Sequence, residues 1–300
     1  MEIRRINIEE IDNFNDRLIA TIGAFDGVHI GHDKLFKTIN ELKKDRENFK
    51  SAVFTFSYHP DYYLNKRENN GNIETEEDRL ILFEKYDFDY VFILDSSVFK
   101  LQYNEFHDKI LDRFNVEIIV IGSDFKYGKD KIGSVQTLKE KYIVYSDLVV
   151  NDDGEKISST MVRDLLEKGE VEKIYNVLGH YYRVNGIISK GAGLGRKLGF
   201  PTANIDVPEN SYLMLEGVYK TNIYIEENKY IGVTNVGKNP TVNTQAKPRI
   251  ETFILDFDEE IYGKKITVEF LSFIRGEKKF NSIDDLVEEI KRNIEKVRNS

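Results

Sequence analysis

The sequence predicts an α/β domain followed by an all-β domain that ends in a helix. Two observations carry this prediction. In the first half, short and nearly continuous apolar strands alternate with amphipathic helices, which is typical of a parallel sheet covered on both faces. After about Tyr182, strand patterns follow one another with little helix between them, which favours an antiparallel barrel or sandwich.

Each element of the first half has its own periodicity. Leu35, Phe36 and Ile39 fall at helical spacing, whereas SAVFTFSY, which starts at Ser51, is a run of mainly apolar residues typical of a strand. The predicted strands span residues 17–25, 51–58, 90–94 and 116–122, and the predicted helices span 32–44, 76–86, 104–114, 159–168 and 171–178.

The second half has five predicted strands, with a hairpin turn at Glu227-Asn228 between the second and the third. These strands span residues 182–189, 217–225, 230–236, 249–257 and 265–273. A helix over 282–297 follows, in which Leu286, Ile290, Ile294 and Val297 form one apolar stripe. We therefore expect two closely joined domains, 1–182 and 183–300.

Composition limits the function. The chain has 300 residues, of which 40% are hydrophobic and 32% are charged, and it lacks cysteine, so neither disulfides nor thiolate metal ligands are available. No apolar run approaches the roughly 18 residues that span a bilayer, and the first residues do not resemble a secretory signal. A net charge of −9 argues against a general nucleic-acid binder. We expect a cytoplasmic enzyme with no nucleic-acid or membrane partner, and a monomer by default.

The strongest motif of the first half is Gly23-Ala24-Phe25-Asp26-Gly27-Val28-His29-Ile30-Gly31-His32, between a predicted strand and a predicted helix. Such a junction offers unpaired N–H groups and the positive end of a helix dipole, which favour phosphate. Its glycines let the backbone approach a ligand closely. His29 and His32 lie three residues apart and can donate hydrogen bonds to phosphate oxygens. Zinc binding by this pair is the alternative, although HEXXH is absent and no third ligand is evident.

This segment resembles the HxGH signature of the nucleotidyltransferase superfamily, and its GxFDGxHxGH form resembles bacterial FAD synthetases. A second nucleotide motif of that family is matched by Ile157-Ser158-Ser159-Thr160-Met161-Val162-Arg163. The resemblance implies a Rossmann-like nucleotidyltransferase domain in which His29, His32 and Arg163 are catalytic. It also implies that ATP is bound by Gly23, Phe25, Asp26, Gly27, Gly31, Ser159 and Thr160.

Two further segments resemble the flavin side of that family: Thr55-Phe56-Ser57-Tyr58-His59-Pro60 and Gly122-Ser123-Asp124-Phe125-Lys126-Tyr127-Gly128. The family usually has proline where Tyr58 stands. The resemblance implies flavin contacts from Phe56, His59, Pro60, Asp124, Phe125 and Tyr127. Taken singly, Phe56 and Tyr127 are also typical core residues.

The second half has a glycine-rich run, Gly191-Ala192-Gly193-Leu194-Gly195-Arg196-Lys197-Leu198-Gly199-Phe200-Pro201-Thr202-Ala203-Asn204. It is not a P-loop, because Gly-Lys-Ser/Thr is missing, and it is not GxGxxG, because position 196 is arginine. No helix is predicted after it.

This run resembles the GRxLGFPTAN signature of riboflavin kinases, which have a small antiparallel β-barrel. The resemblance implies that Thr202 and Asn204 bind Mg²⁺ and the phosphates of ATP, with Gly193, Gly195 and Arg196 around the nucleotide. It also implies that Glu251 is the general base for the riboflavin hydroxyl, and we expect this side chain to face the barrel interior. Arg275 is expected to contact the nucleotide or flavin, or to form a surface salt bridge.

The resemblance covers the whole chain and implies two reactions: riboflavin is phosphorylated to FMN, and FMN is adenylylated to FAD with release of pyrophosphate. Alternatives are a chain with one inactive module, another HxGH adenylyltransferase and a non-catalytic flavin-binding protein. A class I aminoacyl-tRNA synthetase is disfavoured because KMSKS is absent. The chain also departs from the family at Leu178-Gly179-His180-Tyr181-Tyr182, where Leu-Gly-Arg-Pro-Tyr is usual, and at Asn293, where aspartate is frequent.

Overall fold

The structure of the chain is a computed structural model. The structure describes residues 1–58, 60–63, 71–147, 154–191, 193–208, 211–212, 214–238 and 248–299. The chain divides into two compact units, Met1–Ser159 and Thr160–Ser300. The expected division into domains 1–182 and 183–300 stays a prediction.

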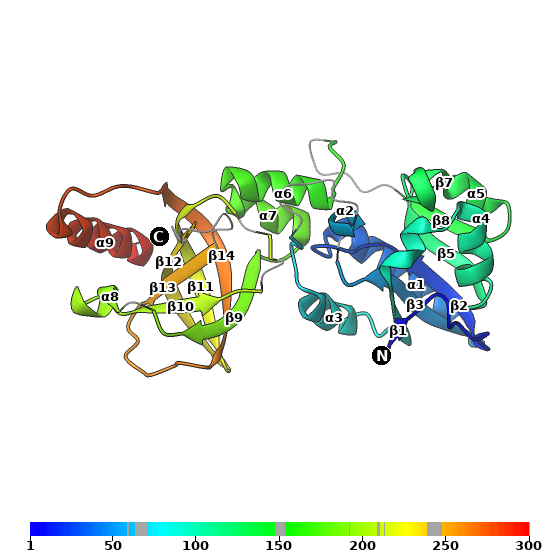
Figure 1. Cartoon of the computed structure of the whole chain (residues 1–300), viewed down its shortest axis with the longest axis horizontal. Coiled ribbons are helices and arrows are strands. Elements are labelled where there is room, and N and C mark those ends of the chain that lie inside the picture. The colour runs from blue at the N-terminus through cyan, green and yellow to red at the C-terminus, as the bar shows by residue number, and fades with distance from the viewer. Residues whose placement is uncertain are drawn as a thin grey trace. The chain divides into compact units, whose positions relative to one another are not determined.

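The first unit is built on a six-stranded sheet in which every pairing is parallel (Figure 1). Parallel strands buried on both faces are expected to be apolar, and β4 (YVFIL) and β5 (VEIIVIG) fit this rule. The strands are β1 (Glu2–Ile6), β2 (Arg17–Ile22), β3 (Phe49–Phe56), β4 (Tyr90–Leu94), β5 (Val116–Gly122) and β8 (Ile143–Asp147), in the spatial order β1-β4-β3-β2-β5-β8.

Helices cover both faces of this sheet, which confirms the predicted α/β architecture. On one face, Phe36 of α1 (Ile30–Lys44) and Phe83 of α3 (Glu76–Glu84) pack with Ile19, Val53 and Val120 of the strands. On the other face, a second core cluster joins the alternate strand residues to α4 (Tyr103–Phe106), the π-helix η2 (His107–Leu111) and α5 (Val135–Lys139). The helix predicted over 104–114 is thus a turn of α-helix followed by a π-helix.

Short elements complete the unit: α2 (Pro60–Tyr63), the 3₁₀ helices η1 (Ser96–Lys100) and η3 (Lys129–Lys131), and the hairpin of β6 (Lys126–Tyr127) with β7 (Gly133–Ser134). The edge strands β1 and β8 were not predicted. Their residues are largely exposed, so they lack the apolar pattern of a strand that is buried on both faces.

The second unit contains a closed antiparallel barrel, as predicted (Figure 1). Its strands are β9 (Arg183–Ser189), β10 (Thr202–Asp206), β11 (Gly217–Ile225), β12 (Asn228–Lys238), β13 (Pro248–Ile254) and β14 (Lys265–Gly276), in the order β10-β13-β12-β11-β14-β9. The turn between β11 and β12 is Glu226-Glu227, because Ile225 pairs with Asn228, so the predicted turn was one residue too late. Glu226 has a φ of +53°, as a tight hairpin turn requires.

Helices α6 (Ser159–Lys168) and α7 (Val171–Leu178) have the predicted bounds, and α7 packs against β14. The terminal helix α9 (Ile283–Arg298) packs against β12, and Val297 of its apolar stripe is buried. A short helix, α8 (Leu194–Lys197), lies in the glycine-rich run, where no helix was expected. None of the helices in the described ranges is long and apolar enough to cross a membrane.

Candidate functional site

The motifs of the first unit meet at the carboxyl edge of its sheet. The histidine loop, residues 23–29, follows β2, the Phe56-Ser57 segment follows β3, and the Asp124 loop follows β5. From β2 the chain continues to β3 and β4 on one side, and it then returns from β4 to β5 on the other side of β2. Such a switch point is where open α/β sheets bind ligands, at the carboxyl ends of the strands.

The histidine loop has an unusual backbone conformation held by buried polar contacts. Phe25, Gly27 and Val28 all have positive φ, of +49°, +85° and +35°, although two of them are not glycine. The buried Asp26 supports this conformation, since its Oδ1 accepts hydrogen bonds from the main-chain N–H groups of Ile73 (2.8 Å) and Glu74 (3.3 Å). Strain maintained in this way is characteristic of functional loops.

His29 and His32 lie together at the start of α1. His29 is the N-cap residue, and its Nδ1 accepts a hydrogen bond from the main-chain N–H of His32. The two imidazole rings stack with their centroids 3.6 Å apart. Burial, with a smaller contribution from Lys156, lowers the pKa of His29 to about 4, and burial lowers the pKa of His32 well below its usual value. Both rings are therefore neutral at pH 7 and can donate hydrogen bonds without carrying charge.

Lys156 is a residue that the motif analysis missed. It forms an ion pair with Asp124, and the charges of both residues influence the pKa of His29. Its side chain is 45% exposed, so the ammonium is accessible to a ligand. It immediately precedes the Ile157–Arg163 motif, and this position is the sequence feature by which Lys156 could have been identified.

The boundary between the two units falls within the second nucleotide motif, between Ser159 and Thr160. Ser159 Oγ donates a hydrogen bond of 2.6 Å to the carbonyl oxygen of Asp26, which joins the start of α6 to the histidine loop. Thr160 is exposed at the first turn of α6. Arg163 belongs to the second unit, where it is buried and its guanidinium lies over the ring of Tyr212, 5.3 Å from the centroid.

The residues predicted to contact flavin have different environments. Phe56 is buried and packs against Phe99, and Tyr127 is buried with its hydroxyl hydrogen-bonded to His107 and Thr137. Both of these therefore also serve the core. Asp124 is exposed, whereas Phe125 and Pro60 are half-buried. His59 lies outside the described residues.

The second unit holds a cavity of about 570 Å³. Every site residue predicted between 183 and 300 lines it: Gly193, Gly195, Arg196, Thr202, Asn204, Glu251 and Arg275. Its wall also contains Asn235, Arg249 and Tyr262, to which the motif analysis assigned no role. A cavity of this size is typical of sites for nucleotide-sized ligands.

A row of polar side chains crosses three neighbouring strands at this cavity. Glu251 of β13 pairs directly with Asn204 of β10 on one side and with Asn235 of β12 on the other. Residues that pair directly project from the same face of a sheet. The carboxylate is therefore flanked by two amides.

Glu251 faces the outside of the barrel, so the expectation that it faces the interior was wrong. Its chain neighbours Ile250 and Thr252 are fully buried, and Thr252 Oγ1 accepts a hydrogen bond from Thr234 in the barrel core. Since side chains alternate along a strand, Glu251 projects outward into the cavity. Residues Leu286, Ile290 and Asn293 of α9 form part of the opposite wall. Helix α9 therefore encloses the Glu251 side chain, whereas the barrel interior was expected to enclose it.

The glycine-rich run lies very close to the polar row. A Cβ atom on Gly191 would lie 2.1 Å from Nδ2 of Asn204, and one on Gly195 would lie 2.4 Å from the carbonyl oxygen of Phe200 and 3.3 Å from Oγ1 of Thr202. A larger residue at Gly195 would collide with main chain, and one at Gly191 would displace the amide of Asn204. The two glycines therefore bring main chain against the side chains predicted to hold metal and phosphate.

Charged groups complete the cavity wall. Arg249 and Glu251 form an ion pair two residues apart on β13. Arg275 and Lys278 both pair with Glu289 of α9, at 3.1 and 3.0 Å, and a hydrogen bond from Lys278 lowers the pKa of that carboxyl group. Arg275 thus lines the cavity and also forms the salt bridge that was the alternative prediction.

Thr202, Asn204 and Glu251 offer a hydroxyl, an amide and a carboxylate oxygen at neighbouring positions of two paired strands. Hard oxygen donors of this kind suit Mg²⁺, which is usually held by few protein ligands and by substrate phosphates. Among the described residues there is no group of three or more His, Cys, Asp or Glu side chains placed to bind a metal ion. The donor set therefore fits a magnesium ion that arrives with a nucleotide.

Two family models match the chain, one for each half. The FAD synthetase model matches residues 11–161, and the riboflavin kinase model matches residues 178–300.

Relatives and a solved structure match nearly the full length. A bifunctional riboflavin kinase/FMN adenylyltransferase of Bacillus subtilis is 33% identical over 284 residues, which cover 91% of this chain and 89% of the relative. The protein of the same name from Listeria monocytogenes is 31% identical, with coverages of 93% and 91%. A crystal structure from Streptococcus pneumoniae, titled as a macrolide-efflux protein, is 30% identical, with a TM-score of 0.87 and 99% coverage of both chains.

Proposed function

The chain belongs to the family of bifunctional riboflavin kinase/FMN adenylyltransferases, and from this membership we propose that it converts riboflavin to FMN and FMN to FAD. The kinase reaction is assigned to the cavity of the second unit and the adenylyl transfer to the histidine loop of the first. The observation that carries the proposal is the row Asn204–Glu251–Asn235, which faces a cavity bounded by the glycine-rich run.

In the kinase reaction, the 5′-hydroxyl of riboflavin attacks the γ-phosphorus of ATP and ADP leaves. Glu251 accepts the hydroxyl proton as general base. Asn204 and Asn235 flank the carboxylate and orient it, and the main chain at Gly193 and Gly195 faces the phosphates. A magnesium ion held by Thr202 and Asn204 would neutralise phosphate charge.

In the adenylyl transfer, a phosphate oxygen of FMN attacks the α-phosphorus of ATP and pyrophosphate leaves. No covalent protein intermediate is needed, so the contribution of the protein is positioning and electrostatic stabilisation. His29 and His32 donate hydrogen bonds to phosphate oxygens from the start of α1, and Lys156 supplies positive charge beside them. Ser159 is assigned to the nucleotide, and Asp124 and Phe125 to the adenosine or flavin end; the roles of Thr160 and Arg163 stay expectations from the resemblance.

Purified protein incubated with riboflavin, ATP and Mg²⁺ tests the proposal by chromatography of the flavins. FMN should form first and FAD should follow. Formation of FMN without FAD, or FAD formation from added FMN only, would indicate that one module is inactive. If no flavin nucleotide forms, the proposal is wrong. A cytoplasmic location, where ATP is available, suits both reactions and stays a prediction, as does the monomeric state.

A further inference from the structure

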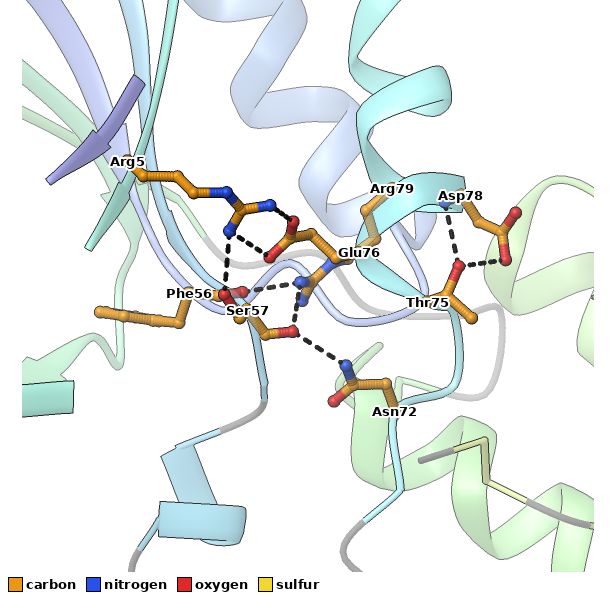
Figure 2. A network of polar contacts seen from close by, with 8 residues as sticks. All are labelled: Arg5, Phe56, Ser57, Asn72, Thr75, Glu76, Asp78 and Arg79. Atoms are coloured by element: carbon orange, nitrogen blue, oxygen red, sulfur yellow. Dashed lines mark hydrogen bonds and ion pairs between the residues drawn. The ribbon is translucent and has the colours of Figure 1, made fainter. Parts of the chain in front are cut away.

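Arg79 of α3 is one of the largest fully buried side chains of the first unit, with 1% of its surface exposed. Its guanidinium donates to three main-chain carbonyl oxygens: Nη1 to Ala24 (2.8 Å), and Nη2 to Phe56 (2.7 Å) and Ser57 (3.1 Å). Figure 2 shows the guanidinium pointing at the Phe56-Ser57 segment. No motif of the sequence analysis included this residue.

The three carbonyl groups belong to two segments that are far apart in the sequence. Ala24 lies in the histidine loop after β2, whereas Phe56 is the last residue of β3 and Ser57 follows it, in the segment assigned to the flavin. One planar group therefore joins the part of the site assigned to ATP with the part assigned to FMN. Thr55 Oγ1 donates to the same Ala24 oxygen at 3.3 Å, which adds a weaker link between these segments.

Burial of a guanidinium is costly unless nearby groups compensate its charge. Burial lowers the pKa of Arg79, and the carboxylates of Asp26, Glu76 and Glu74 act in the opposite direction. The same buried charge contributes to the low pKa of His32, after burial and the charge of His29. An apolar side chain in this position could not donate to the three carbonyl oxygens, so the arginine does more than fill the core.

We propose that Arg79 is a positioning residue of adenylyl transfer, which holds the histidine loop and the end of β3 at the separation that aligns ATP with FMN. This inference rests on the proposed function. In-line attack is sensitive to distance, and a misplacement of about 1 Å can cost about 100-fold in rate. The affinity for ATP or for FMN depends less on Arg79, because the residues that contact each substrate are still present when Arg79 is replaced. The rate constant kcat should therefore fall while KM for each substrate changes little.

Arg5 provides a matched control within the same network. It lies on β1 with 66% of its side chain exposed, and it pairs with Glu76 and contacts Ser57 Oγ (Figure 2). Arg5 donates a hydrogen bond to Ser57, whereas Arg79 also donates one to Ala24 in the histidine loop. Replacement of Arg5 therefore removes an arginine from the network and leaves the connection between the two segments intact.

The test compares Arg79→Met, Arg79→Lys and Arg5→Met in the full chain. FAD formation from FMN gives kcat and both KM values, and FMN formation from riboflavin reports on the other module. We expect kcat for FAD formation to fall about 100-fold in Arg79→Met and about 10-fold in Arg79→Lys, with both KM values within threefold of wild type. Arg5→Met should stay within twofold, and FMN formation should be unchanged in all three.

Hydrogen exchange measured by mass spectrometry separates positioning from unfolding. In Arg79→Met, exchange should rise in residues 23–28 and 56–58 and stay unchanged in β5, whereas unfolding of the unit would raise it in β5 as well. If Arg79→Met unfolds, Arg79→Lys decides the question. Wild-type kcat in a folded Arg79 variant, or an equal loss in Arg5→Met, would overturn the proposal. Failure of the proposed function is distinct, because wild type itself would then form no FAD.

Discussion

The imidazole rings of His29 and His32 stack with their centroids 3.6 Å apart and their planes at 17°. Two protonated imidazoles at this distance would repel each other, and both rings are buried. The pair therefore exists in its neutral form, at the end of a helix that presents main-chain N–H groups. Main-chain N–H groups at a helix start and neutral imidazole donors suit phosphate, so we propose that this pair binds it, with Lys156 supplying positive charge.

The low pKa of His29 predicts acid destabilisation of the first unit. In the unfolded chain the imidazole takes up a proton near pH 6.5, and in the folded unit only near pH 4. Between these values the unfolded chain binds more protons, so stability is complete above about pH 6.5 and decreases as the pH falls. At pH 5, His29 alone should cost about 2 kcal/mol relative to pH 7.5. Urea unfolding at the two pH values measures this, and His29→Gln should reduce the difference. Equal stability of wild type at both pH values would contradict the buried neutral pair.

Glu251→Gln should lower kcat for FMN formation at least about 100-fold, because general-base catalysis contributes about 10²–10⁴. The amide keeps the size and hydrogen-bonding capacity of the side chain but does not take the hydroxyl proton. FAD formation from added FMN should remain within twofold of wild type, since Glu251 lies in the second unit. Retention of FMN formation would show that another group is the base.

Gly191→Ala should reduce FMN formation about tenfold or more, because the new methyl group would lie 2.1 Å from Nδ2 of Asn204 and displace it. Gly276→Ala is the matched control: Gly276 also belongs to this unit, but a Cβ there meets nothing within 4 Å. Steady-state assays of both variants, with Mg²⁺ varied, measure the effect. The result that argues against this account is equal activity of the two variants.

Lys156→Met should reduce FAD formation about tenfold and leave FMN formation unchanged, because it removes the cation beside His29 and His32. Lys126→Met is the control, since Lys126 is an exposed lysine that follows the same Asp124 loop. Comparison of kcat/KM for ATP in the two variants checks this. A similar effect of both substitutions would point to general surface charge rather than to Lys156.

Strong local patterns predicted much of the fold. Strands β4, β5 and β11 and helices α6 and α7 have the predicted bounds, because apolar runs and helical spacing are local properties of the chain. Strand β10 was missed, since Thr202–Asp206 is short and is positioned by pairing with β9 and β13. Pairing between distant segments leaves no pattern within five residues.

In the candidate sites, too, residues within local motifs were predicted, and residues positioned by distant segments were missed. The motif residues Thr202, Asn204 and Glu251 line one cavity, but the expectation that Glu251 faces the barrel interior was wrong. That face depends on the cover that α9 supplies from the end of the chain, which alternation along β13 alone does not indicate. Arg79 and Lys156 were missed because their partners lie in other segments, at Ala24 and Phe56 for the arginine and at Asp124 for the lysine.

A complementation assay tests most directly whether two complete sites exist in one chain. Glu251→Gln and His32→Ala are each incubated with riboflavin, ATP and Mg²⁺, alone and mixed. Two separate sites predict no flavin nucleotide from Glu251→Gln, FMN without FAD from His32→Ala, and FAD from the mixture. Loss of both activities in either single variant, measured with riboflavin and with added FMN, would contradict the account.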